Sequence, residues 1–105
     1  VGATNTANAT GSTTLNFDTY QNHVLTATGN ITLANPSTES VGQTGFIAII
    51  QDGTGSRTLT LGTDYESPAS GGITLTTTAS ATDIVPYVVV AANRVALGTP
   101  QLAFG

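Results

Sequence analysis

Residues 25–33 alternate strictly between two kinds of side chain. One set is aliphatic or small, and every position between consists of threonine or asparagine. The first set is Leu25, Ala27, Gly29, Ile31 and Leu33. Because a period of two places successive side chains on opposite faces of a β-strand, this segment is predicted to be a strand with its hydroxyl groups in water. Gly29, at its centre, predicts a bend or a bulge.

The rest of the chain repeats this β pattern and contains no helical one. Nowhere do apolar residues recur at spacings of three and four over ten positions, and threonine, which favours strands over helices, fills 21 of the 105 positions. Further strands are predicted at residues 15–20, 46–50, 57–61, 73–76, 84–91 and 95–97. Short strands at this spacing predict an all-β single domain: an antiparallel β-sandwich or jelly roll, or a small barrel.

The most apolar predicted strand leads directly into a glycine-rich connection. Residues 46–50 are apolar without interruption, which is typical of a strand covered on both faces. In residues 51–56, Gly53 and Gly55 are free to adopt positive φ, as hairpin-type connections require. This connection lacks the lysine of a phosphate-binding loop and precedes a strand instead of a helix, so we interpret it as a turn.

The two ends of the chain differ in composition from its middle. Residues 1–14 hold one large apolar residue, Val1, and are predicted to form an extended N-terminal arm that either frays or docks on a partner. The β-sandwich domain is expected at residues 15–99 and a short C-terminal tail at residues 100–105. Leu102 and Phe104 in this tail are exposed unless something covers them. Val1, Leu102 and Phe104 are therefore the predicted interface residues.

Charge and composition exclude several classes of function. Arg57 and Arg94 are the only basic residues, and the formal net charge is -4. Nucleic-acid binding needs a basic stripe, recognition of anionic lipid needs clustered basic residues, and no apolar run reaches the ~20 residues of a membrane span. We therefore expect neither a nucleic-acid nor a membrane partner. The absence of cysteine excludes disulfides and thiolate sites.

Few side chains offer catalytic or metal-binding chemistry. His23 is the single histidine, and in a polar turn without a nucleophile-elbow motif it is expected to be solvated. Asp64 and Glu66 would share one face of a strand and, with Asp52, supply oxygen ligands of the kind calcium prefers, but the EF-hand spacing is absent. We predict no enzymatic activity, no cofactor and no metal.

Candidates for surface contact come from one aromatic residue and the glycine-rich turn. Tyr87 is expected in the core, whereas Tyr65, in a predicted loop at residues 62–72, is the plausible exposed platform for a sugar. We group Tyr65 with Asp52, Gly53 and Gly55 as a possible surface-loop contact. Carbohydrate-binding modules usually carry more aromatic residues than this chain, tryptophan among them.

One long segment has a recognisable arrangement. From Gly42, the sequence Gly-Gln-Thr-Gly leads into the apolar strand, then into Gln-Asp-Gly-Thr-Gly-Ser-Arg-Thr-Leu and a strand that ends at Gly62. A loop with proline and glycine, an alternating strand at residues 73–77 and an apolar hairpin at residues 84–97 follow. This arrangement resembles a β-domain common in structural proteins of the tailed-bacteriophage virion, and the resemblance extends over residues 15–97.

The resemblance implies a virion structural protein, usually trimeric. Because the chain reads as one small module without a repetitive shaft, we interpret it as a capsid decoration (cement) protein that binds the major capsid protein or other virion proteins. The alternative is a tail-fibre or receptor-binding module, and a third hypothesis, from a different class, is a carbohydrate-binding adhesin. Thirteen alanines and twelve glycines leave a small apolar core, which adds the expectation of a homo-oligomer.

Overall fold

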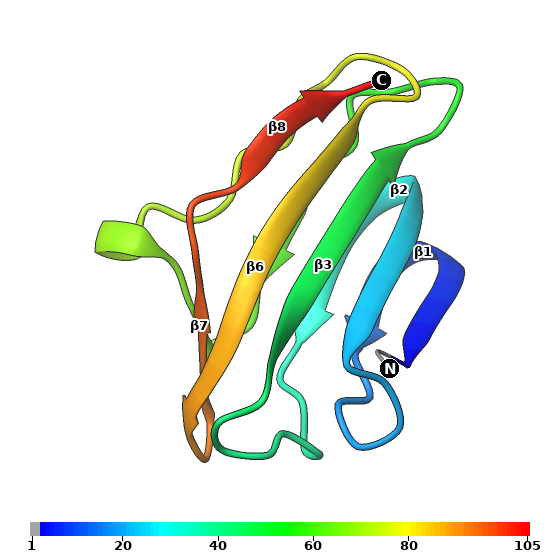
Figure 1. The fold of residues 1–105 in the computed structure, drawn as a ribbon. Helices are drawn as coiled ribbons and strands as arrows, with labels where there is room; N and C mark the ends of the chain where they lie inside the picture. Colours follow the sequence, from blue (N-terminus) through cyan, green and yellow to red (C-terminus); the bar gives the residue numbers. More distant parts are fainter. Residues whose placement is uncertain (1–2) are drawn as a thin grey trace.

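The computed structural model describes residues 3–105, and the predicted all-β single domain is confirmed (Figure 1). The elements are β1 (Thr4–Thr14), β2 (Asn22–Ala34), β3 (Thr44–Gln51), β4 (Leu59–Leu61), β5 (Tyr65–Glu66), the 3-10 turn η1 (Pro68–Ser70), β6 (Thr82–Ala91), β7 (Arg94–Leu97) and β8 (Gln101–Phe104). The strands form one sheet in the order β1-β2-β3-β6-β7-β5, with β4 beside β2 and β8 beside β6.

Two long strands each change partner along their length, and this curls the sheet around one core. The first half of β2 pairs with β3 and its second half pairs with β4. On the other side, β6 pairs with β3 along one edge, and with β7 and β8 along the other. In Figure 1, β3 and β6 cross the front of the molecule, and η1 projects to the left, beyond β7.

Gly29 marks the bend in β2 that the alternating pattern predicts. Between Ala27 and Ile31, β2 advances four residues while β1 advances only two, from Ala9 to Gly11. A Cβ atom at Gly29 would overlap the Thr10 hydroxyl, so glycine here leaves room for the Thr10 side chain of β1. The bend redirects β2 from its pairing with β3 to its pairing with β4.

The expectation of antiparallel pairing is wrong for four of the seven strand pairs. The pairs β1–β2, β2–β3, β2–β4 and β5–β7 are parallel, while the pairs β3–β6, β6–β7 and β6–β8 are antiparallel. The alternating pattern gave no warning, because side chains alternate between faces in parallel and antiparallel strands alike. Residues 15–20, predicted as a strand, form the loop that connects the parallel strands β1 and β2, with Leu15 and Phe17 buried in the core.

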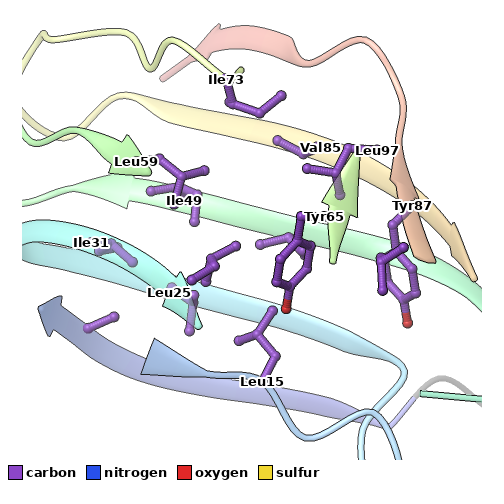
Figure 2. Packing of buried hydrophobic residues seen from close by; sticks show 14 of the residues in the cluster. Leu15, Leu25, Ile31, Ile49, Leu59, Tyr65, Ile73, Val85, Tyr87 and Leu97 are labelled. Carbon is purple, nitrogen blue, oxygen red and sulfur yellow. The ribbon is translucent and has the colours of Figure 1, made fainter. Parts of the chain in front are cut away.

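The core is built largely from the side chains that the period-two pattern places on one face (Figure 2). In β2 the apolar set apart from Gly29 is buried, with no side chain more than 1% exposed. Tyr87 is buried as predicted, and its hydroxyl donates to the Gln21 carbonyl. Ile73 and Leu75 are buried and Thr74 is exposed, as the alternation predicts, but this extended segment joins no strand ladder.

Both end segments that the sequence separates from the domain form edge strands within it. The predicted arm is β1, which pairs with β2 from Thr4 to Thr14. The predicted tail contains β8, which pairs with β6. Backbone hydrogen bonds to a neighbouring strand satisfy the polar groups of such a segment, so a weakly apolar sequence can be ordered without a core face of its own. Val1 lies outside the described residues.

Candidate functional site

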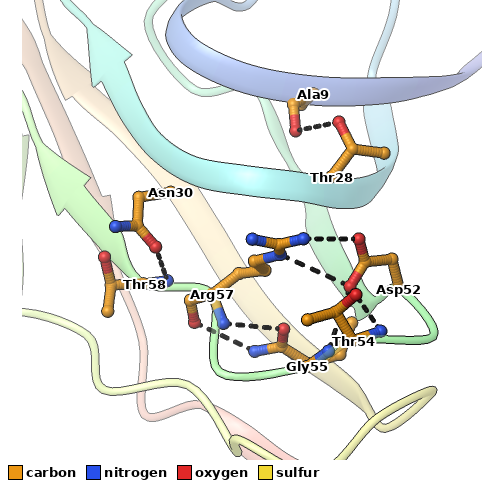
Figure 3. Close-up of polar contacts among 9 residues, drawn as sticks. Ala9, Thr28, Asn30, Asp52, Thr54, Gly55, Arg57 and Thr58 are labelled. Carbon is orange, nitrogen blue, oxygen red and sulfur yellow. Dashed lines mark hydrogen bonds and ion pairs between the residues drawn. The ribbon is translucent and has the colours of Figure 1, made fainter.

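The glycine-rich turn between β3 and β4 is organised around one carboxylate. Asp52 Oδ1 accepts the backbone N–H groups of Thr54 at 3.1 Å and Gly55 at 3.0 Å (Figure 3). Arg57 closes the turn through an ion pair of 2.9 Å with Asp52 Oδ2. The Arg57 hydrogen bond, followed by that from Gly55, lowers the pKa of the Asp52 carboxyl. These internal partners account for the charge of Asp52, so the turn presents a fixed shape instead of a free carboxylate.

Gln51, which the sequence gives no reason to single out, holds the base of this turn. Its side chain is only 2% exposed. Its Nε2 donates to the carbonyls of Arg57 at 3.0 Å and Thr76 at 2.8 Å, and its Oε1 accepts the Arg57 N–H at 3.0 Å. The Gln51 side-chain amide thus satisfies backbone groups of Arg57 and Thr76, which are not paired with a neighbouring strand. Buried polar groups satisfied in this way make the turn rigid.

The two glycines of the turn, Gly53 and Gly55, differ in backbone conformation and in the space available for a side chain. Gly55 has φ +75°, and a Cβ there would overlap the Thr77 carbonyl and the Ala79 amide. Gly53 has no positive φ, and a Cβ there would meet nothing within 4 Å. The predicted positive φ is therefore confirmed at Gly55 and wrong at Gly53.

We expect Gly55→Ala to lower the free energy of unfolding by about 2–4 kcal/mol, since the left-handed backbone and the clash with backbone atoms add. Gly53→Ala is the matched control, with an expected change within about 0.5 kcal/mol. Urea denaturation of both variants measures the difference. Equal losses in the two variants would contradict the geometry of the turn.

Tyr65 is not the exposed aromatic platform that its loop position predicts. It lies in β5, is 5% exposed and packs in the core. Burial raises the pKa of its hydroxyl, which has no hydrogen-bond partner among the described residues. The parallel pair Tyr65–Val95 turns this side chain inward, a placement that loop composition does not reveal. Tyr65 therefore cannot join Asp52, Gly53 and Gly55 in one surface contact, and the sugar-binding hypothesis loses its aromatic residue.

An open cleft of about 710 Å³ lies between β4–β5 and the segment around η1. Hydroxyl groups and glycines dominate its lining, with Thr60, Thr63, Ser67 and Ser70 among the hydroxyl-bearing residues. Glu66 also borders it, but this carboxylate pairs with Arg94 at 2.7 Å, and the Arg94 hydrogen bond lowers the Glu66 pKa. The cleft thus offers neutral polar contacts and no free charge.

The acidic residues considered as calcium ligands are not brought together. Within residues 3–105, no three side chains of the metal-ligating kinds are grouped. Asp52 pairs with Arg57 within the turn between β3 and β4, whereas Glu66 of β5 pairs with Arg94 of β7. Asp64 lies in the turn before β5, so the predicted arrangement of Asp64 and Glu66 on one face of a strand does not form.

His23 is buried, not solvated as its polar surroundings in the sequence predict. It is the second residue of β2, is 0% exposed, and its ring packs edge-on against Phe17 at 5.2 Å and Tyr20 at 6.2 Å. Neither ring nitrogen has a hydrogen-bond partner among the described residues, and burial lowers the pKa of His23 to about 4. An uncharged imidazole held among aromatic rings is a core side chain here.

The predicted interface residues at the C-terminus are exposed. Leu102 and Phe104 on β8 are 52% and 49% exposed. Phe104 pairs with Thr82 of β6, so these two side chains lie on the same face of the sheet. Val90 and Val41 are further exposed large apolar residues, at 42% and 69%.

The described residues thus form a small all-β domain with an internally bonded turn and with four large apolar side chains exposed. No helix among residues 3–105 is long and apolar enough to cross a membrane. The chain belongs to the family described as "Putative phage tail fibre C-terminal domain", which matches residues 4–93. No curated protein and no solved structure matches it.

The family match bears directly on the expected place in the virion. It confirms the resemblance to a structural β-domain of the phage virion. It does not support capsid decoration, and the tail-fibre alternative fits it better. Capsid decoration was inferred from the small size of the module and its lack of a repetitive shaft. A module of a tail fibre has the same two features, so size does not distinguish the two classes of protein.

Proposed function

We propose that this chain is a non-enzymatic module of a phage tail fibre, located in the virion and bound to other virion proteins. The observation that supports this proposal is the family match, which extends from the start of β1 into the turn between β6 and β7. The side chain of Gln51 makes its hydrogen bonds to backbone groups of the domain itself. The buried His23 makes none to the described residues. Neither side chain is therefore directed at a ligand, which is consistent with a structural role.

Location and copy number in purified virions test this proposal. We expect an antibody against the chain to label the tail, and gel densitometry to give three to a few dozen copies for each particle. Hundreds of copies on the head would overturn the tail-fibre proposal and restore capsid decoration. Binding of the isolated chain to host glycans, without label on the virion, would instead favour the adhesin.

A further inference from the structure

The glycine-rich turn between β3 and β4 contains a dipeptide that rearranges easily. Asp52 is followed by Gly53, whereas no other acidic residue and no asparagine of the chain is followed by glycine. Glycine opens its peptide nitrogen to attack on the preceding side chain, because it has no Cβ and its backbone turns freely. Gly53 is exposed, and a Cβ there would meet nothing within 4 Å. The surroundings of Gly53 therefore leave room for a rearrangement.

The rearrangement is the isomerisation of Asp52 to isoaspartate. The Gly53 nitrogen attacks Cγ of the protonated Asp52 carboxyl, the Cγ–OH bond breaks, and the hydroxyl leaves with the amide proton as water. The product is a succinimide ring. Solvent water then opens the ring at one of its two carbonyl carbons. Opening at Cγ restores aspartate, whereas opening at the other carbon routes the main chain through Cγ, and no oxidant or reductant is needed.

Four hydrogen bonds hold the Asp52 carboxylate in its ionised form (Figure 3). Oδ1 accepts the N–H groups of Thr54 at 3.1 Å and Gly55 at 3.0 Å. Arg57 Nε donates to Oδ1 at 3.4 Å, and Arg57 Nη2 donates to Oδ2 at 2.9 Å. The Arg57 hydrogen bond contributes most to the lowered pKa of Asp52. An ionised carboxylate resists attack by a nucleophile, because its oxygen must be protonated before it can leave as water.

Ring closure would also break contacts of the folded turn. Loss of Oδ2 removes the acceptor of the ion pair with Arg57, and loss of Oδ1 leaves the Thr54 and Gly55 N–H groups without their acceptor. The main chain is fixed as well, because the Asp52 carbonyl accepts the Ser80 N–H at 3.2 Å. The folded turn thus opposes the reaction through both the charge and the position of the carboxylate.

We propose that Asp52–Gly53 is a latent isoaspartate site of this protein, and that the Arg57 guanidinium protects it in the folded domain. Arg57 then has a chemical role, whereas ion pairs near the surface usually add little to stability. The proposal concerns the chain itself and holds for any location of the module in the virion.

The protection matters because isomerisation would dismantle the turn. Isoaspartate adds one methylene to the main chain and moves the carboxylate away from its donors. The turn is joined to residues 77–80, since Ser56 donates to the Thr77 carbonyl at 2.9 Å and Ser80 donates to Asp52. Gly55 has no room to adjust, because it lies close to Thr77 and Ala79. A structural protein of an assembled particle is not replaced, so slow damage of this kind would accumulate.

Prolonged incubation of the full chain at neutral pH tests the proposal. Isoaspartate is quantified by enzymatic methylation and located by mass spectrometry of the peptide that contains residues 52 and 53. We expect the wild type unfolded in urea to form isoaspartate there roughly tenfold faster, or more, than the folded wild type, since hydrogen bonds to a charged group must be lost first. Folded Arg57→Gln should regain most of that rate.

Two further variants serve as controls. Arg94→Gln removes the other arginine ion pair, with Glu66, and leaves the turn intact, so it should react as slowly as the folded wild type. Gly53→Ala, for which the turn has room, should slow the reaction of the chain in urea, because its Cβ hinders the approach of the nitrogen to Cγ.

Urea denaturation of each variant separates loss of protection from loss of folding. An Arg57→Gln chain that keeps its cooperative transition reacts from the folded state. If it does not fold, Arg57→Lys takes its place, and this variant should also react faster than the wild type because lysine cannot donate in the same fork. Equal rates in folded and unfolded wild type, or no isoaspartate in either, overturn the proposal. A folded Arg57 variant as slow as the wild type, or Arg94→Gln as fast as Arg57→Gln, also overturns it, since Arg57 is then not the protecting group.

Discussion

Ile49→Asp should abolish folding of this domain. Ile49 is a residue of β3, is 1% exposed, and lies between Leu25 of β2 and Asp83 of β6. The new carboxylate would lie in the core, directly across from a carboxylate that is already buried. An unpaired buried charge costs several kcal/mol, and a like charge beside it adds to that cost. Since a domain of this size has a stability of about 5–15 kcal/mol, we expect no cooperative unfolding transition.

Thr74→Asp is the control for this substitution. Thr74 is exposed and lies between two buried residues of the same extended segment. The added charge therefore stays in water, and the free energy of unfolding should change by at most about 0.5 kcal/mol. Circular dichroism followed by urea denaturation measures both variants. If both were tolerated equally, the assignment of core and solvent faces would be wrong.

The period-two pattern predicted which side chains are buried, because burial in a strand depends only on the alternation of faces. Leu25, Ile49 and Tyr87 are in the core as expected. Even Leu75, in a segment that joins no ladder, follows the alternation. The pattern also indicated the bend at Gly29, because a glycine inside an otherwise regular strand marks a bulge or a close approach of another backbone.

Strand pairing could not be predicted in the same way. Local alternation contains no information on which neighbour a strand meets or in which direction, so the parallel pairing of β1 with β2 had no signal. Composition misjudged β1 for a related reason: an edge strand is held by backbone hydrogen bonds, which every residue except proline can donate. Threonine, asparagine and alanine serve there as well as aliphatic residues.

The polar side chains of the core were the least predictable. Asp83 accepts the backbone N–H groups of Thr76 at 2.6 Å and Ala103 at 2.8 Å, and so connects two segments far apart in the sequence. Its place in an alternating strand does indicate an inward side chain, because Val85 shares its parity. His23 carried the same indication, because it shares the parity of Leu25 in β2. Tyr65 offered none, since its placement depends on a strand pair with Val95 that forms only in the complete fold.

His23 should make the domain sensitive to acid between pH 6.5 and pH 4. In the unfolded chain its pKa is 6.5, whereas burial in the folded state lowers that pKa to about 4. Between these values the unfolded chain binds one more proton than the folded chain, so stability falls as the pH falls. The full contribution is present above pH 6.5, and about 3 kcal/mol is lost by pH 4.

His23→Leu isolates this effect, because leucine keeps the position buried and apolar. The stability of this variant should be nearly constant from pH 6.5 to pH 4, where the wild type declines. Asp52 and Glu66, whose pKa values are lowered by their arginine partners, lose their contribution only below their ordinary values near pH 4. Urea denaturation at a series of pH values measures both proteins, and NMR titration of the imidazole gives the folded pKa. An equal decline in the variant would assign the acid sensitivity to other groups and contradict the buried, unpartnered state of His23.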